Sequence, residues 1–467
     1  MTHGLQSLRR ARSLLLTLRL GDLPEHIPSW TSVREFGVAP VEHIDGGLID
    51  RLLRHHGGAA RSARLHRALK PRQACPGVKG ARRFDELEQI TGVARVLRIE
   101  VADDAGVDAL VDALSQVALV ESVRPDWLCS VPFDIGPSST ATSRIDLEAA
   151  WRMRELVQFH QALGYEPGSP SVKLGLADTG VFSSHAELDA RLSTGFDTVD
   201  LTQQDVGSLQ LVGDNTQRDE EPNDEVGHGT GCAGILSANG LMLPPGSAGL
   251  CGLVPVRVLG AVRSGEGRVG IGALNNIDAG MKRLIDLGVK VINMSFGTAA
   301  SALRPGDALP HDEVVRYALA RGVLLVAASG NSGIEELYYP AAYPGVIAVG
   351  SIDVDLRPSR FSTRGDHVTL CAPGRKVWTC GLDGYREVSG TSFAAPLVAA
   401  ACALLASRAE RRAWPLTPDV ARDLLMRSAR PFRHADVQGC GAGVLDVLAA
   451  LQLLDEHINR SLDDDES

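Results

Sequence analysis

Three short motifs place Asp178, His228 and Ser392 where secondary structure is predicted to begin or end. Asp178 closes the apolar run VKLGLAD, His228 is the second residue of GHGTGCAG, and Ser392 lies in SGTSFAAP. A serine hydroxyl is a poor nucleophile near neutral pH and needs a base to take its proton. An imidazole accepts and returns protons in this range, and a carboxylate can fix its tautomer. Together these residue types could attack an acyl carbon.

Each motif alone has a more ordinary interpretation. The DTG of Asp178 is more often turn chemistry, and the lack of a second DTG or DSG in the sequence disfavours an aspartic protease dyad. A single histidine carries little information. The small residues after Ser392 predict a close-packed helix whose N-terminal N–H groups would face its hydroxyl. The order Asp, His, Ser, each at a strand end or helix start, is a far stronger signal than any one motif.

The three motifs in this order resemble the subtilisin-like (subtilase) serine peptidase family, over about residues 93 to 450. The resemblance implies a serine endopeptidase acting through an acyl-enzyme, with Ser392 as nucleophile, His228 as general base and Asp178 as its orienting carboxylate. Asn331, in VLLVAASGNSG, matches the oxyanion asparagine of the family, and the backbone N–H of Ser392 would be the second donor.

The resemblance also implies two backbone rails for an extended peptide and a pocket for the residue before the cut. The residues it assigns are Ser295, Phe296 and Gly297 for one rail, Ser264 to Gly267 for the other, and Ala328, Ser329 and Gly330 for the pocket. Tyr338 would lie near the pocket floor. A phenol there would shorten the pocket and favour small or medium side chains.

Two residues depart from the family pattern. Gly231 stands where the family usually has a second histidine, and Cys232 stands where valine is common. Neither touches a triad role, but Cys232 would lie one helical turn from His228 and predicts thiol sensitivity. Two other functions stay open beside hydrolysis: a catalytically silent fold used as a binding module, and acyl transfer to an amine, giving peptide ligation or cyclisation.

Composition and charge narrow the class of protein. The chain has 467 residues, of which 44% are hydrophobic and 22% charged, with a formal net charge of -10. Such a composition is typical of a soluble globular protein, and the negative charge argues against nucleic acid or an anionic membrane as partner. The N-terminal LRRARSLLLTLRL is too broken by arginine for a signal peptide. We therefore expect a cytoplasmic protein without a membrane span, with secretion that needs no cleavable signal as the alternative.

Cysteine and acidic residues are the candidate metal ligands of this sequence. The eight cysteines form no CxxC pair and no zinc-ligand spacing, so most are expected to be small buried residues. Cys371 and Cys380 bracket a short loop, but a reducing compartment disfavours a disulfide between them. No cofactor is expected for catalysis. The family implies structural calcium, and DNTQRDEEPNDEVG is rich in oxygen ligands, yet its spacing specifies no coordination and favours a solvated acidic loop.

The pattern of elements predicts an α/β fold with two domains. VARVLRIEV, AGVDALVDALSQV and ALVESVRPDW read as strand, helix and strand. We assign residues 46–132 to a small α/β domain that resembles the propeptide of these enzymes, with an ordinary auxiliary domain as the alternative. Residues 1–45 show no firm period and are unassigned. A protease made in the cytosol must be restrained, by this propeptide-like domain or by a separate inhibitor.

Buried strands then alternate with amphipathic helices, which predicts a parallel sheet covered on both faces. The clearest strands are VKLGLAD, VPVRVLG, VKVINMSFG, VLLVAASG and GVIAVGS. Residues 133–144 are predicted to form a linker. Residues 145–452 are predicted to form the subtilisin-like peptidase domain, a three-layer domain built on a parallel sheet. Residues 453–467 are predicted to form an acidic, solvated tail. Protein or peptide substrates are the expected partners.

Overall fold

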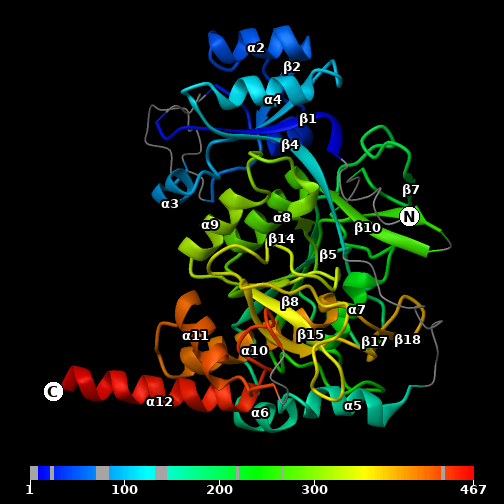
Figure 1. The fold of residues 1–467 in the computed structure, drawn as a ribbon, viewed down its shortest axis with the longest axis vertical. Helices are drawn as coiled ribbons and strands as arrows, with labels where there is room; N and C mark the ends of the chain where they lie inside the picture. The colour runs from blue at the N-terminus through cyan, green and yellow to red at the C-terminus, as the bar shows by residue number, and fades with distance from the viewer. Residues whose placement is uncertain are drawn as a thin grey trace.

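A computed structural model describes residues 9–21, 26–69, 84–131, 145–216, 220–265, 267–432 and 437–466. The predicted linker at 133–144 and Cys75 lie outside the described residues. The α/β architecture predicted from the sequence is confirmed, with a smaller N-terminal domain above a larger one in Figure 1. We refer to the larger, from residue 145 onward, as the peptidase domain.

A parallel sheet of seven strands forms the centre of the peptidase domain, and it contains all five strands that the sequence predicts most clearly. Each strand reads as a short apolar run because both faces of the sheet are covered. Across the sheet the strands are β16 (Val368–Pro373), β15 (Ile347–Ile352), β13 (Leu324–Ala328), β11 (Val291–Met294), β5 (Lys173–Asp178), β8 (Gly252–Arg257) and β6 (Phe196–Asp197).

Helices cover both faces of this sheet. Alternate strand residues enter different cores, so Val326 packs with the helices of one face while Leu325 packs with those of the other. The first face carries α5 (Leu147–Glu155), α6 (Phe159–Tyr165), α7 (His228–Ser237), α10 (Thr391–Arg411), α11 (Pro418–Ser428) and α12 (Val447–Glu466). The second carries α8 (Leu274–Asp286) and α9 (Asp312–Ala320).

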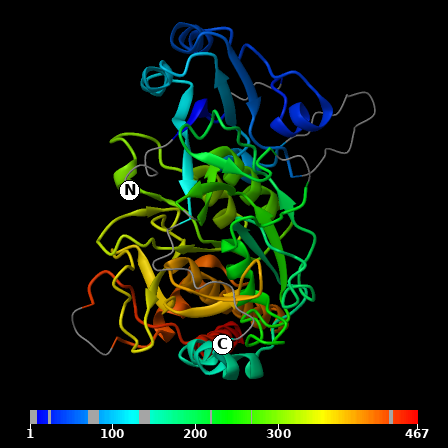
Figure 2. The ribbon, with the colours of Figure 1, turned by 90° about the vertical axis from the view of Figure 1, so that its right-hand side faces the viewer.

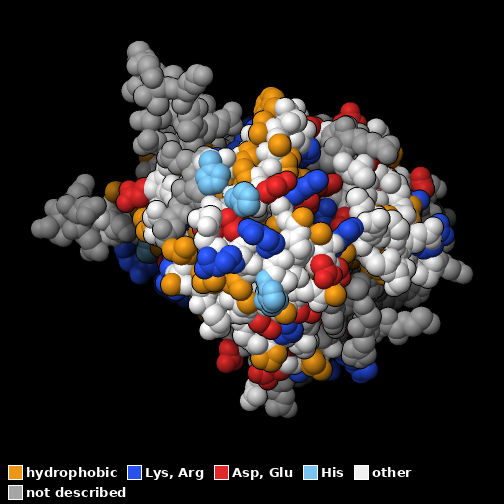
Figure 3. All heavy atoms as spheres, turned by 90° about the horizontal axis from the view of Figure 1, so that it is seen from above, with side chains coloured by type: hydrophobic (Ala, Val, Ile, Leu, Met, Phe, Trp, Pro, Cys, Tyr) orange, Lys and Arg blue, Asp and Glu red, His pale blue; other side chains and the backbone are white. Residues whose placement is uncertain are grey.

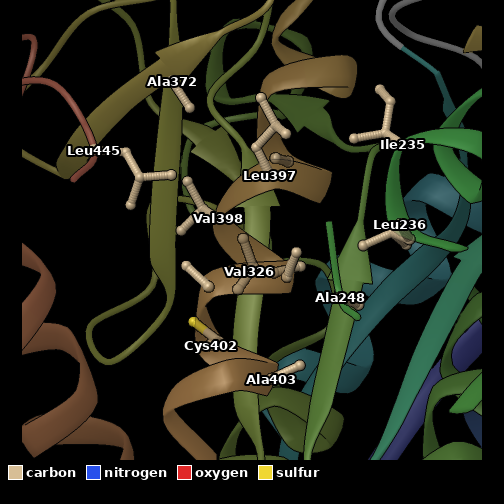
Figure 4. Close-up of a cluster of buried hydrophobic side chains, with 14 of the residues drawn as sticks. Ile235, Leu236, Ala248, Val326, Ala372, Leu397, Val398, Cys402, Ala403 and Leu445 are labelled. Carbon is tan, nitrogen blue, oxygen red and sulfur yellow. The ribbon is translucent and has the colours of Figure 1, made fainter. Parts of the chain in front are cut away.

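Helix α10 is the central helix of the first face. Figure 4 shows Leu397, Val398 and Cys402 on it, facing Val326 of the sheet and Leu445 beyond. Its length and apolar composition would also suit a membrane span, but 89% of its apolar window is buried inside the protein. The helix is hydrophobic on all sides because protein surrounds it, as is typical of a helix in a protein core.

The N-terminal domain contains the predicted strand, helix and strand as β3 (Val96–Val101), α4 (Val107–Ser115) and β4 (Val120–Ser130). Its other elements are β1 (Arg9–Leu18), α1 (Trp30–Phe36), α2 (Leu48–Gly57), β2 (Ala60–Arg64) and α3 (Glu86–Ile90). Strand β1 lies between β3 and β4 and pairs with both. The segment 1–45, which could not be assigned from the sequence, therefore supplies a central strand of this domain. The leucines of β1 are buried in the domain, but the arginines around them hid this pattern in the sequence.

Strand β4 joins the two domains. The N-terminal sheet has the order β2-β3-β1-β4 and continues into β10 (Gly267–Ala273), β9 (Gly260–Ser264) and β7 (Gln210–Val212) of the peptidase domain. Figure 1 shows β4 as a long cyan strand running down beside β10, and Figure 2 shows the same arrangement from the side. The backbone of one domain is thus an added strand on the other.

Short elements complete the peptidase domain. They are the pair β12 (Thr298–Ala299) and β14 (Tyr338–Tyr339), the pair β17 (Val377–Cys380) and β18 (Tyr385–Val388), and one turn of 3-10 helix at Ala300–Ala302. Helix α12 runs through the predicted boundary at 452, with Leu454 and Ile458 buried. The first part of the predicted tail is therefore packed helix.

The upper face of the N-terminal domain mixes charges of both signs. In Figure 3, Lys and Arg side chains lie beside Asp and Glu, with hydrophobic and His side chains between them. A face of this kind offers no extended field of one sign.

Candidate active site

Asp178 and His228 meet at the carboxyl end of the central sheet. Asp178 is the last residue of β5, and His228 is the first residue of α7. Nδ1 of His228 lies 2.7 Å from Oδ1 of Asp178, and the backbone N–H of Thr179 donates to the same oxygen at 2.7 Å. Because a carboxylate only accepts, this contact requires a proton on Nδ1 and leaves Nε2 as the basic nitrogen. Both side chains are buried.

Asp224 fixes the start of α7 and was not singled out from the sequence. Its Oδ1 accepts from the hydroxyl of Thr179 at 2.9 Å and the N–H of Gly227 at 2.8 Å. Its Oδ2 accepts from the N–H and the hydroxyl of Thr230 at 2.9 and 2.6 Å. One buried carboxylate thus ties the end of β5 to the first turn of the helix that carries His228. Its place four residues before His228, after a polar run, was the only available signal.

Ser392 lies in the first turn of α10, buried, with its hydroxyl donating to the carbonyl of Ser295 at 3.4 Å. Cys232 links it to the other two residues. The Sγ of Cys232 is 3.4 Å from the carbonyl oxygen of Ser392, and ligand atoms of Cys232, His228 and Asp178 all lie within 4.8 Å of one another. The thiol therefore neighbours the side chains of His228 and Asp178 and the backbone carbonyl of Ser392, three residues far apart in the sequence.

The side-chain amide of Asn331 is held in one orientation by Thr391. Its Oδ1 accepts from the N–H of Thr391 at 3.0 Å and from the hydroxyl at 2.9 Å. These two donors identify the oxygen, and the Nδ2 group lies 3.2 Å from a Cβ built on Gly390. Thr391 is itself buried, and its hydroxyl accepts from the N–H of Gly330 at 3.3 Å. Asn331 was predicted from the sequence, whereas a role for Thr391, which precedes Ser392, was not.

Strand β4 contacts one of the two predicted rails directly and lies beyond the other. Gly297 donates its N–H to the carbonyl of Ser130, the last residue of β4, at 3.2 Å. On the other side β4 pairs with Ile271 to Ala273 of β10. Ser264 and Gly267 flank the turn of the β9–β10 hairpin, ahead of the residues of β10 that pair with β4.

The predicted pocket residues meet Tyr338. Gly330 has a φ of +103°, and a Cβ built on it would lie 3.2 Å from Cγ of Tyr338. A Cβ on Gly297 would lie 2.5 Å from Cε1 of the same ring. Both positions thus require glycine, since the phenol ring packs directly on their backbones. Ala328 and Ser329 are fully buried beside Gly330, and Phe296 is buried next to Gly297. Burial raises the pKa of Tyr338, so its phenol stays protonated at neutral pH.

The two departures from the family pattern have local packing reasons. A Cβ on Gly231 would lie 3.2 Å from Cε1 of Phe393 and 3.3 Å from Cγ2 of Thr379. The missing side chain makes room for Phe393, whose ring lies 5.2 Å from the imidazole of His228. Cys232 is buried and 3.8 Å from the hydroxyl of Ser295. With His228 and Asp178, its thiol forms a cluster that could bind a soft metal ion such as mercury.

Cys371 and Cys380, considered as a disulfide, are both free and buried. Among the described cysteines, Cys371 instead neighbours Cys440, with its Sγ 3.3 Å from the Cys440 carbonyl. In the acidic loop, Asp224 binds the start of α7, and Glu225 pairs with Arg257 at 3.0 Å. Asp224 and Glu225 thus bind protein groups in this loop.

Comparison with known proteins identifies the family. Residues 169–443 match the model of the subtilase family. The chain is 31% identical over 340 residues to the thermophilic serine proteinase of Bacillus sp. (strain AK1), covering 70% of this chain and 72% of that protein. It is 34% identical over 246 residues to the major intracellular serine protease of Bacillus subtilis (strain 168), covering 51% and 70%.

A solved structure shows the same fold. The prenylagaramide maturation protease PagA superposes with a TM-score of 0.51 at 25% identity, covering 64% of this chain and 98% of that one. The family match spans the motifs of Asp178, His228 and Ser392, which meet in the described site. This protein is therefore a member of the subtilase family of serine proteases.

Proposed function

We propose that this protease is an endopeptidase that hydrolyses peptide bonds through an acyl-enzyme, with Ser392, His228 and Asp178 as its catalytic triad. The observation that carries the proposal is the contact of His228 with Asp178 at 2.7 Å, in the same buried cluster as Ser392. Labelling by a fluorophosphonate probe tests it most directly.

In this mechanism Ser392 attacks the carbonyl carbon of the substrate while Nε2 of His228 takes the hydroxyl proton. Asp178 holds Nδ1–H and stabilises the imidazolium that forms. The collapse of the tetrahedral intermediate expels the amine, which receives the proton from His228, and water then releases the acyl group by the same steps. The Nδ2 of Asn331 and the N–H of Ser392 are the proposed donors to the oxyanion.

We also propose that the N-terminal domain restrains the enzyme. The end of β4 lies between the two rails, bonded to Gly297 on one side and paired with Ile271 to Ala273 on the other. A substrate would need the same backbone groups. The domain therefore competes with substrate as a propeptide does, and cleavage after β4, in residues 130–145, would release it.

The experiment compares Ser392→Ala with Ser389→Ala, a matched loss of a hydroxyl whose native role is to accept from the N–H of Lys376. We expect the parent chain and Ser389→Ala to bind the probe and cut a protein substrate, and Ser392→Ala to do neither. Ser392→Ala should also stay full length. Labelling that persists in Ser392→Ala would overturn the triad.

Mass spectrometry of the products separates hydrolysis from acyl transfer. Hydrolysis adds one water to each bond cut, whereas acyl transfer to an amine adds none, so a ligated or cyclic product is one water lighter than the corresponding hydrolysis products. For location, we propose the cytoplasm, because the described cysteines are free and buried and because one relative is an intracellular protease. Fractionation of cells with an antibody tests this, and recovery of the protein in the medium would overturn it.

A further inference from the structure

A polar pocket beneath β4 holds the side chain of Cys129. The thiol is buried, with its Sγ 3.0 Å from Oγ1 of Thr298 and 3.6 Å from Nε2 of His311. Thr298 and His311 belong to the peptidase domain, whereas Cys129 belongs to the N-terminal domain. Phe296 completes the wall, with its ring 5.7 Å from the imidazole. One side chain of the occluding strand is thus recognised by two hydrogen-bonding groups.

The register of β4 shows which substrate residue would enter this pocket. Ser130 accepts from the N–H of Gly297 in an antiparallel bridge. In an antiparallel peptide bound in this register, the residue two places after the one opposite Gly297 would stand opposite Ser295, and Ser295 accepts from the hydroxyl of Ser392. If a peptide binds in this way, its residue opposite Ser295 lies next to Ser392 and is the last residue before the scissile bond. The residue in the place of Cys129 lies three positions earlier in the peptide. It is therefore the fourth residue before the scissile bond.

The pocket is built to donate a hydrogen bond. Nδ1 of His311 lies 2.5 Å from Oδ1 of Asp278, and both side chains are buried. Burial lowers the pKa of His311, but Asp278 more than offsets this and raises it to about 10. At neutral pH the imidazole is therefore protonated on both nitrogens, and its Nε2–H faces the pocket. Asp278 keeps the charge paired, so the pocket is polar without a net charge of its own.

From these contacts we propose that His311 and Thr298 select a small side chain with a hydrogen-bonding atom, namely that of Cys, Ser or Thr, at the fourth position before the scissile bond. The inference rests on the proposed endopeptidase function. A large apolar side chain there would bury the Nε2–H of His311 and the hydroxyl of Thr298 without partners, which costs binding energy.

Peptides that differ only at this position give the sharpest test, because Thr and Val have the same shape. After removal of the N-terminal domain by self-processing, we expect kcat/KM to be about tenfold or more higher for the Thr peptide than for the Val peptide. An apolar pocket would reverse this order. Thr298→Val should reduce the preference, and Thr298→Ser, which keeps the hydroxyl, should retain it.

A second measurement does not depend on turnover. In the full-length Ser392→Ala chain, the proposal predicts a higher Tm for Cys129→Thr than for Cys129→Val, since the same pocket receives the strand. Cleavage with equal or reversed preference between the peptides would overturn the pocket and leave the endopeptidase function intact. Loss of both labelling and cleavage would overturn that function, and the order of the two Tm values would then decide the pocket alone.

Discussion

Asn331 acts, in the proposed mechanism, through the direction of one N–H bond. Loss of the corresponding donor costs about 10² to 10³ in turnover in this family, and we expect the same range for Asn331→Ala. Thr391→Val keeps the shape but removes the hydroxyl that holds Oδ1 of Asn331. It should lower kcat by about tenfold, since one of two orienting bonds is lost, with KM little changed. Steady-state kinetics checks both, and an increase in KM alone would contradict the orienting role.

His311 gives the protein a pH dependence of its own. Its folded pKa of about 10 lies above the ordinary value of 6.5. The folded chain therefore keeps a proton that the unfolded chain releases, so the stabilisation is complete below about pH 6.5 and is lost as the pH rises toward 10. Urea denaturation of the Ser392→Ala chain should show stability falling across this range, and His311→Gln should flatten the fall. Equal slopes in both chains would contradict the paired imidazolium.

At the scale of elements, the start of α7 depends on Asp224. Asp224→Ala removes the acceptor for the N–H groups of Gly227 and Thr230 and leaves them buried. We expect a loss of about 1–3 kcal/mol in the free energy of unfolding, and reduced turnover because His228 moves with the helix. Asp224→Asn retains one acceptor oxygen and should lose less. Urea denaturation and kinetics together check this, and unchanged stability in Asp224→Ala would contradict it.

At the scale of the whole molecule, buried ion pairs join the two domains. Arg124 of β4 binds both oxygens of Glu313 at 3.1 and 2.6 Å, and both side chains are buried. Although burial raises the pKa of Glu313, Arg124 holds it well below its usual range. Lys282 of α8 likewise binds Glu88 of α3 at 2.7 Å. In both pairs, a buried charged side chain of one domain finds its partner of opposite charge in the other domain.

Arg124→Met should therefore loosen the N-terminal domain strongly, since Glu313 would remain buried without its partner. Breaking such a pair costs about 3–5 kcal/mol, and replacing both members costs less. We expect faster probe labelling of Ser392 and faster proteolysis of the N-terminal domain in Arg124→Met. The double variant Arg124→Met, Glu313→Leu should move back toward the parent chain. A single variant as slow to label as the parent would contradict this account.

Motifs with local geometry could be found from the sequence, whereas partners that meet across the fold could not. Asp178, His228 and Ser392 stand where apolar runs end or small-residue helices begin, so their places followed from pattern. Thr391 and Asp224 carry no such pattern, because a threonine or an aspartate in a loop is usually turn chemistry. The pairing of β4 with Ile271 could not be predicted either, because glycine marks both turns and close backbone contacts.

The sequence by itself determined the class of fold, the family and the three residues of the proposed triad, since strand and helix periods and short motifs are local properties of the chain. Only the tertiary structure decided that β1 is a central strand, that β4 lies in the cleft, and that Cys129 meets His311. These contacts join residues far apart in the chain, where hydrogen bonding and burial depend on which surfaces the whole fold brings together.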